Sequence, residues 1–160
     1  MIRHFTSTGI VVSGSASLVH WHAKVQAWLA PGGHIEPNED PVQATLREVK
    51  EETDLDVKIL PTYASPSISN LEQVSAPYTI MVEDVYDKEV GKHQHIDFIY
   101  FTTPAEPSSG LPSVPDGWHW LSEADLKNEK RLQAPNGELV APPEDVIKLS
   151  LEAIQTLRRS

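Results

Sequence analysis

The chain has 160 residues, 39% of them hydrophobic and 22% charged, which is ordinary globular composition, so we expect one domain over residues 1–160. The formal net charge of -10 argues against a nucleic-acid partner, because binding a phosphate backbone needs a basic face. The lack of cysteine excludes disulfides, thiolate nucleophiles and cysteine-based zinc sites.

Short apolar runs rich in β-branched residues and separated by turn residues predict about six strands. In chain order they cover residues 9–12, 17–19, 25–29, 57–60, 78–85 and 96–101. A helix is predicted between the third and fourth strands, and another at 143–157, because apolar residues recur there at helical spacing. Two helices against a mixed sheet make an α/β/α sandwich, and this α/β fold is our expectation.

The first helix is predicted to begin with Asp40 as its cap and Pro41 at its first position. The residues expected to form its packing face are Val42, Leu46, Val49 and Thr53.

Glu48, Glu51 and Glu52 share another face of this helix, within an arc of roughly 100°. Carboxylates at this spacing repel one another, and a divalent cation reverses the sign of that interaction. Magnesium prefers carboxylate oxygens and keeps several waters, so the cluster suits Mg²⁺, with Mn²⁺ as a substitute, better than it suits zinc. On spacing alone, a solvated glutamate-rich face is the alternative.

The stretch PGGHIEPNEDPVQATLREVKEETDL, residues 31–55, resembles the Nudix box, G-x5-E-x7-R-E-U-x-E-E-x-G-U with U a bulky aliphatic residue. The matching positions are Gly33, Glu39, Arg47, Glu48, Val49, Glu51, Glu52 and Leu55. WLAPGG at 28–33 and WHWLS at 118–122 extend the resemblance to most of the chain. It implies a MutT-like Nudix fold and hydrolysis of a nucleoside diphosphate linked to another moiety, by attack of a metal-activated water on phosphorus.

The resemblance also implies roles. The expected metal ligands are Glu48, Glu51, Glu52 and the carbonyl of Gly33. Glu51 is a further ligand or the base near the water, and Gly32 and Gly33 are expected to let the loop turn tightly. Arg47 would hold the catalytic glutamates through bidentate contacts, and Glu39 would brace it. Taken alone, without the resemblance, these two residues are best interpreted as a surface salt bridge.

Asp54 departs from the box, which has glycine at this position. Glycine ends a helix in a left-handed conformation without strain, whereas aspartate adopts it less easily and adds a charge at the unfavourable end of the helix dipole. We interpret Asp54 as a cost to stability outside the carboxylate cluster.

His93, His95 and Asp97 alternate in HQHIDFIYF and so share one face of a predicted strand. Similar Nudix sequences carry an H-x-H-x-D motif on this strand. Three interpretations stay open: a solvent face, a face that contacts the substrate beside the box, or a zinc site whose third ligand is not identified. His34 directly follows the glycines and could donate to a phosphate.

Two features follow near the C-terminal end. Residues 103–117, TPAEPSSGLPSVPDG, form either a linker-like surface loop or a substrate lid. Ser122 and Asp125 resemble a capping box that starts a short helix.

The leading hypothesis is a Nudix pyrophosphohydrolase. The rivals are a Nudix-fold nucleotide-binding or regulatory domain with weak or no turnover, and an acidic helix that binds calcium structurally. A binding-only domain has no need of all three glutamates together. ADP-ribose, a nucleotide sugar, a dinucleoside polyphosphate and an oxidised nucleoside triphosphate all stay open as substrates.

The location and assembly of the chain are expectations from its ends and composition. No run of about 18 apolar residues and no leader-like N-terminus are present, so we expect a cytoplasmic protein with no membrane partner. The partner is expected to be a small-molecule nucleoside diphosphate derivative. The oligomeric state stays open, with a homodimer as one option.

Overall fold

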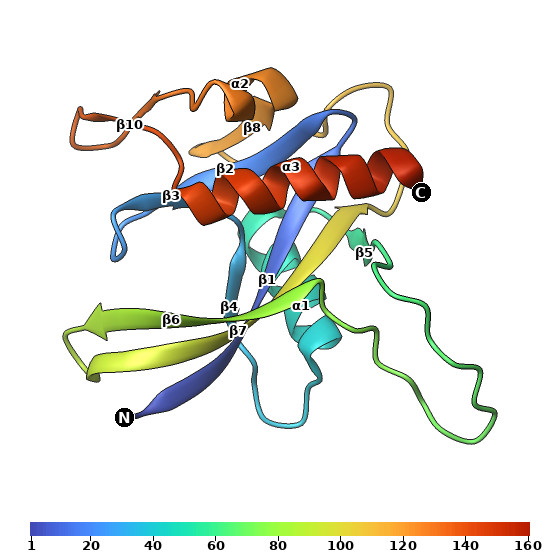
Figure 1. Ribbon diagram of the computed structural model, residues 1–160. Helices are drawn as coiled ribbons and strands as arrows, with labels where there is room; N and C mark the ends of the chain where they lie inside the picture. The colour runs from blue at the N-terminus through green and yellow to red at the C-terminus, as the bar shows by residue number, and fades with distance from the viewer.

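A computed structural model of the protein describes all residues 1–160 and shows a mixed sheet with helices on its two faces (Figure 1). The strands are β1 Arg3–Ser13, β2 Ala16–His22, β3 Ala27–Leu29, β4 Gly32–His34, β5 Val57–Ile59, β6 Thr79–Asp87, β7 Gly91–Pro104, β8 Trp118–Ser122, β9 Leu132–Gln133 and β10 Leu139–Val140. The helices are α1 Pro41–Thr53, α2 Glu123–Lys127 and α3 Glu144–Arg159. All six predicted strands and both predicted long helices are therefore present.

The two longest strands, β1 and β7, lie side by side at the centre of an eight-stranded sheet. They run parallel, and their pairing extends from Arg3 opposite Gln94 to Val11 opposite Thr102. All other neighbouring strands are antiparallel. Strands β2, β3 and β8 continue the sheet beyond one end of β1, and β4 pairs with the middle of β1. Strands β5 and β6 pair with β7. The sheet is thus mixed, as predicted.

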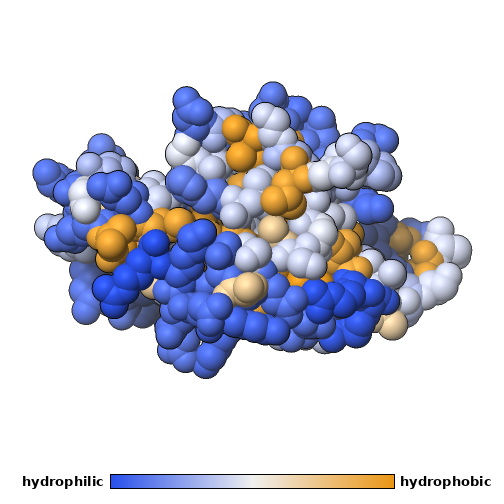
Figure 2. Space-filling view, turned by 90° about the horizontal axis from the view of Figure 1, so that it is seen from above, coloured by the Kyte–Doolittle hydropathy of each residue, from blue (hydrophilic) through white to orange (hydrophobic).

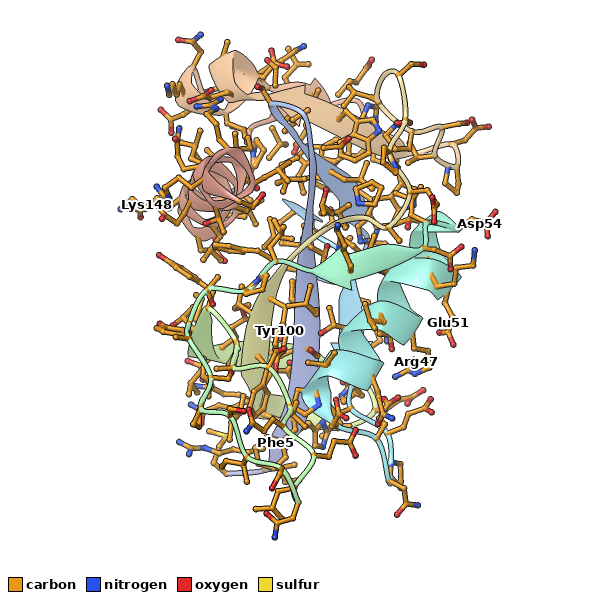
Figure 3. The ribbon with its side chains drawn as sticks, turned by 90° about the vertical axis from the view of Figure 1, so that its right-hand side faces the viewer. Phe5, Arg47, Glu51, Asp54, Tyr100 and Lys148 are labelled. Atoms are coloured by element: carbon orange, nitrogen blue, oxygen red, sulfur yellow. The ribbon has the colours of Figure 1, made fainter.

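Helices α1 and α3 cover opposite faces of this sheet (Figures 1 and 3). The main core lies on the α3 face, where Ile10 and Phe101 of the sheet meet Ile154 of the helix. A smaller cluster on the other face contains Val11 and Val49. Successive residues of β1 point to opposite faces, so one strand serves both cores. The α/β/α sandwich is confirmed.

Helix α1 begins as predicted, because Asp40 accepts a hydrogen bond from the backbone N–H of Gln43 at 2.9 Å. Its packing face is rotated from the predicted one. The buried residues are Ala44, Thr45, Val49 and Thr53, while Val42 and Leu46 are only half-buried. The reason is Gly9 on β1: a Cβ there would lie 2.8 Å from Cγ2 of Val49. The helix therefore sits close to the strand and turns its smaller residues inward.

Four of the ten strands, β4, β8, β9 and β10, are not among the six predicted. Ser122 and Asp125 form the capping box of α2. The segment 105–117 is a packed surface loop: Val114 packs against the smaller cluster, and the indole N–H of Trp120 donates to the Pro112 carbonyl at 3.0 Å. The loop does not line the cleft described below, so the lid interpretation does not hold.

The outer surface is mainly hydrophilic on the face drawn in Figure 2, where hydrophobic residues show in limited groups between polar ones. None of the helices is both long and apolar enough to span a bilayer.

Asp54 has the left-handed backbone expected of it, with φ 60° and ψ 10°, directly after α1. Its charge is not unpaired, because Nζ of Lys50 lies 3.2 Å from its carboxylate. Asp54→Gly is expected to remove about 1 to 2 kcal/mol of strain, against a few tenths for the exposed ion pair and up to roughly 1 kcal/mol for the freer unfolded chain. The melting temperature should rise by about 1 to 3 °C in thermal unfolding, and turnover should stay within about threefold.

Asp54→Ala is the matched control, because alanine also loses the ion pair but keeps the β-carbon that causes the strain. It should melt below the wild type. Equal falls for the glycine and alanine variants would show that the ion pair, and not backbone strain, dominates at this position.

Candidate active site

The carboxylates of α1 lie against the short strand β4. Oε2 of Glu52 accepts a hydrogen bond from the backbone N–H of Gly32 at 3.1 Å. A Cβ at Gly33 would lie 2.5 Å from Cδ of Glu48 and 2.8 Å from its Oε2. The expected tight turn is wrong: both glycines are in a strand paired with β1, and neither has a positive φ. Gly33 is needed because the Glu48 carboxylate lies so close to its backbone, whereas a Cβ at Gly32 would lie 2.6 Å from the Ser7 carbonyl oxygen of β1.

Arg47 is the hub of this site. Its guanidinium donates to both carboxylate oxygens of Glu39, at 2.6 and 3.1 Å, and to Oε1 of Glu48 at 2.8 Å. The guanidinium also donates to the carboxylate of Glu51 at 3.3 Å and to the backbone carbonyl of His34 at 3.0 Å. The planar fork thus ties the box carboxylates to the strand edge. Arg47 and Glu51 project from the same side of α1 (Figure 3).

The electrostatics of the cluster are those of crowded carboxylates. Burial, with smaller contributions from the charges of Glu48 and Glu51, raises the pKa of Glu52 to about 7, against the opposing effect of the hydrogen bond from Gly32. Hydrogen bonding to Arg47 lowers the pKa of Glu39, so this carboxylate stays ionised beside the guanidinium. One cation, Arg47, cannot neutralise all of these groups, and the site favours a further positive charge.

A cleft opens on the other side of β4. A cavity of about 240 Å³ is lined by Gly33 and His34 together with Asp97 of β7. It adjoins a larger cavity of about 590 Å³, because Thr8, Asp97 and several other residues line both. The larger cavity has apolar walls, for example Leu149 of α3. Lys24 is the only lysine or arginine that lines either cavity, so an anionic ligand would meet little positive charge from the protein.

Four carboxylate residues line the larger cavity: Glu83, Asp84, Asp97 and Asp145. Asp97 accepts hydrogen bonds from the hydroxyls of Thr6 at 3.0 Å and Thr8 at 2.7 Å, yet burial raises its pKa to about 6. Burial, followed by the charges of Asp97 and Asp145, raises the pKa of Glu83 to about 7. These groups come from β6, β7 and α3, so the cleft joins three elements far apart in sequence.

The raised pKa of Glu83 predicts a pH-dependent stability. The folded protein holds a proton that the unfolded chain loses near pH 4.5, so the free energy of unfolding should fall as the pH rises from about 4.5 to 7. Glu83→Gln removes the ionisation and should raise the melting temperature at pH 8 but change it little at pH 4.5. Thermal unfolding across this range tests it, with exposed Glu89→Gln as the control. Equal shifts at both pH values would contradict the assignment.

The structure brings most of the predicted site residues together. Arg47 joins Glu39, Glu48 and Glu51 in one hydrogen-bonded network, and Glu52 lies beside it, bonded to the backbone N–H of Gly32. His34, His95 and Asp97 line the smaller cavity, whereas His93 lies behind them with 1% of its surface exposed. The solvent-face interpretation of the H-x-H-x-D motif is therefore wrong, because His93 and Asp97 are buried.

Sequence reasoning missed His4, Glu83 and Asp145. His4 lies opposite His95 through the parallel pairing of β1 with β7, and Glu83 lies opposite His95 on the other neighbour, β6. The register of the strands, which the pattern of apolar residues does not fix, places His4 and Glu83 there, and the packing of α3 brings Asp145 to the larger cavity, which Glu83 also lines.

Known proteins resemble this chain along most of its length. A family model described as NUDIX domain matches residues 3–141. An RNA pyrophosphohydrolase of Proteus mirabilis is 30% identical over 125 residues, which cover 72% of this chain and 68% of that protein. A Lactococcus lactis protein named "Probable DHNTP pyrophosphohydrolase" is 29% identical over 115 residues, covering 72% and 63%. The crystal structure of a NUDIX family hydrolase from Clostridium perfringens superimposes with a TM-score of 0.70 at 30% identity, covering 98% and 99% of the two chains.

Proposed function

The chain belongs to the Nudix family of hydrolases acting on pyrophosphate bonds, and from this premise we propose that it cleaves, with a divalent cation, a nucleoside diphosphate linked to another moiety. Residues 1–160 would act as one catalytic domain. The observation that carries the proposal is the approach of Glu48 and Glu52 to the two glycines of β4, with Arg47 holding the cluster.

The residues at this place fit a hard cation. Glu48 and Glu52 offer carboxylate oxygens at the edge of β4, and backbone carbonyl oxygens are of the same chemical class. Burial first, and then the charges of Glu48 and Glu51, raise the pKa of Glu52, so a bound cation would favour its ionised form. We assign Glu48, Glu52 and the carbonyl of Gly33 as the groups that would hold Mg²⁺ or Mn²⁺, with Glu51 as a further ligand or base.

A bound Mg²⁺ would neutralise the diphosphate and lower the pKa of a coordinated water. The protein's own groups do the rest. Arg47 keeps Glu48 aimed at β4. Its contact with Glu51 is longer, at 3.3 Å, and the Glu51 side chain is 60% exposed, so this carboxylate would be accessible to accept a proton from the attacking water. Glu39 fixes the guanidinium through two parallel hydrogen bonds and thereby positions the whole set.

The cleft supports a small-molecule substrate. With its diphosphate at the edge formed by Gly33 and His34, such a molecule would extend past His95 and Asp97 into the larger cavity. The apolar walls of that cavity suit a base or sugar ring, and its carboxylates suit hydrogen-bond donors on that ring. The two named relatives carry different substrates in their names, RNA and DHNTP, so the names do not choose among the classes.

A substrate panel tests the proposal. The purified protein with Mg²⁺ is offered ADP-ribose, nucleotide sugars, dinucleoside polyphosphates and nucleoside triphosphates, including oxidised ones, and phosphate is measured after coupling to a phosphatase. We expect release from one class, lost on chelation and restored by Mg²⁺ or Mn²⁺. Undiminished release in excess chelator would overturn metal dependence, and tight binding of a nucleotide without any release would identify a binding or regulatory domain instead.

A further inference from the structure

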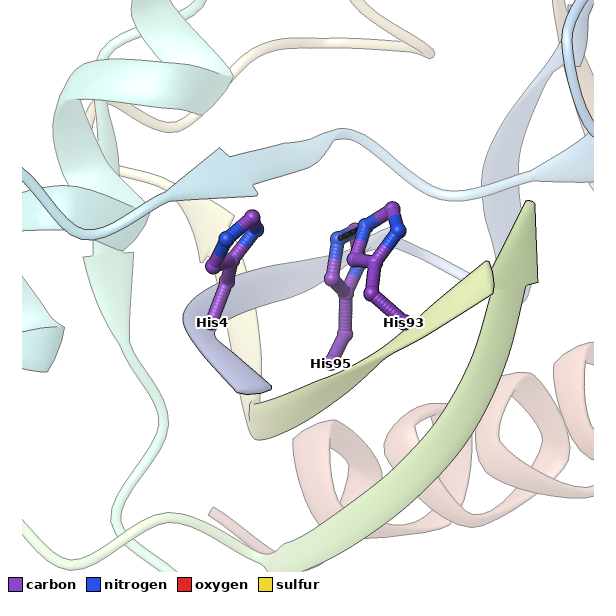
Figure 4. Close-up of side chains that lie close together, drawn as sticks. All are labelled: His4, His93 and His95. Atoms are coloured by element: carbon purple, nitrogen blue, oxygen red, sulfur yellow. Dashed lines mark hydrogen bonds between the residues drawn. The ribbon is translucent and has the colours of Figure 1, made fainter. Parts of the chain in front are cut away.

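Histidine side chains gather where β1 and β7 begin to pair, beside the active site and outside the carboxylate cluster. His4 lies opposite His95 in the parallel register, and His93 is on the same face two residues earlier. The ring centroid of His4 is 4.9 Å from that of His93 and 6.0 Å from that of His95, and the latter two rings are 5.0 Å apart. Figure 4 shows the three rings projecting to the same side of the sheet.

The buried ring of this group is held in a defined orientation. Nδ1 of His93 lies 2.9 Å from the carbonyl oxygen of Gly91, which can only accept, so Nδ1 carries the hydrogen. In the neutral ring, Nε2 then presents a lone pair, and it lies 3.2 Å from Nε2 of His95. A backbone hydrogen bond that fixes the tautomer in this way is typical of a histidine that binds a metal.

We propose that His4, His93 and His95 bind one zinc ion. One nitrogen from each ring lies within 4.8 Å of the others. Zinc binds imidazole nitrogen at about 2.0 to 2.1 Å, so two ligands of a tetrahedral site are about 3.3 Å apart, close to the separation of His93 and His95. To reach the spacing of a tetrahedral site, the two most widely separated nitrogen atoms of the three rings must move closer together by at most about 1.5 Å.

The chemistry of these ligands separates this site from the carboxylate cluster. Imidazole nitrogen suits zinc and its neighbours in the transition series, whereas Mg²⁺ is held by oxygen. Asp87, with Oδ2 3.9 Å from Nε2 of His93, contributes negative charge that favours a cation. Of the three proposed ligands His95 lines the smaller cavity, together with His34 and Asp87, so water or a ligand oxygen in the cleft could supply a fourth ligand.

The rival account is a hydrogen-bonded histidine cluster without metal, in which His95 donates to His93 and His34 to His4. Metal binding distinguishes the two. The test uses a double variant of the full chain that carries both Glu48→Gln and Glu52→Gln, so that the carboxylates of α1 compete little for zinc. Excess Mg²⁺ is added to occupy any remaining site with oxygen ligands. Zinc affinity is measured by competition with a chromophoric chelator, and Co²⁺ absorption reports four-coordinate nitrogen ligation.

We expect one zinc per chain and a cobalt spectrum with the visible bands of a four-coordinate ion. His95→Gln in the same background should weaken zinc by at least about 10-fold, the loss seen when even an outer partner of such a ligand is removed. The exposed His119→Gln, on β8, is the matched control and should bind as the parent does. If His95→Gln does not fold by circular dichroism, His4→Gln replaces it, with the same expectation.

Two results would overturn the proposal. The first is that the parent double variant binds no zinc, which would leave a hydrogen-bonded cluster. The second is that the histidine variants bind zinc as tightly as the parent, which would place the ion elsewhere. Neither result bears on pyrophosphate hydrolysis, which the substrate panel tests separately.

Discussion

Glu52→Gln is expected to lower turnover by at least about 100-fold, equivalent to a loss of about 2.7 kcal/mol in transition-state stabilisation. The amide keeps the shape of the side chain, and its oxygen can still accept the hydrogen bond from Gly32. It cannot supply an anionic ligand to a divalent cation. Folding should be little affected, because the pKa of Glu52 is raised to about 7, so the folded protein already favours a neutral group there. Steady-state kinetics on the substrate identified by the panel measure the effect.

Glu36→Gln is the matched control for charge alone. Glu36 lies near the same network, with a carboxylate oxygen 3.9 Å from Nε of Arg47, but its side chain is 62% exposed. Its removal should change turnover by less than about threefold, as expected for a screened surface charge. Near-normal turnover of Glu52→Gln would show that the carboxylates of α1 are only a solvated face.

Gly33→Ala is expected to reduce turnover by a comparable factor, about 100-fold, through its effect on Glu48. The new β-carbon would occupy the place of the Glu48 carboxylate, 2.5 Å from its Cδ. The carboxylate is the far end of a flexible side chain, so it can move away without disturbing the backbone. Stability should therefore change little, and kcat should fall because Glu48 leaves the place where Arg47 holds it.

Gly110→Ala provides the control, because a Cβ at Gly110 meets nothing within 4 Å. Its turnover and melting temperature should match those of the wild type. A Gly33→Ala protein that turns over normally would mean that Glu48 can serve from a displaced position, and the assignment of Glu48 to the cation would fail. A large fall in melting temperature would point instead to damage in the pairing of β4 with β1.

The helix that carries the carboxylates was predictable from sequence because its determinants are local. Asp40 and Pro41 start it, and Asp54 ends it in the left-handed conformation expected where the family pattern has glycine. These effects act within one or two turns and are visible in a short stretch of sequence. The same holds for the capping box of Ser122 and Asp125.

The parts that could not be predicted depend on contacts between distant segments. The packing face of α1 shifted because Gly9 admits the helix close to β1, a contact that helical periodicity alone does not contain. His4 was missed as a neighbour of His95 because the parallel register of β1 and β7 is set by the whole sheet. Glycines 32 and 33 were expected in a turn, and their strand pairing with β1 has the same non-local origin.

The parallel pairing of β1 with β7 has a consequence for folding during synthesis. Thr6 and Asp97, which share a hydrogen bond in the cleft, are 91 residues apart in the chain. A ribosome adds about 5 to 20 residues per second, so β1 waits roughly 5 to 20 s before its central partner is made. During that interval the first strand can form only its antiparallel pairings with β2 and β4. The catalytic helix can therefore be complete well before the cleft exists, and the nascent chain carries an unpaired strand edge that favours association with other chains.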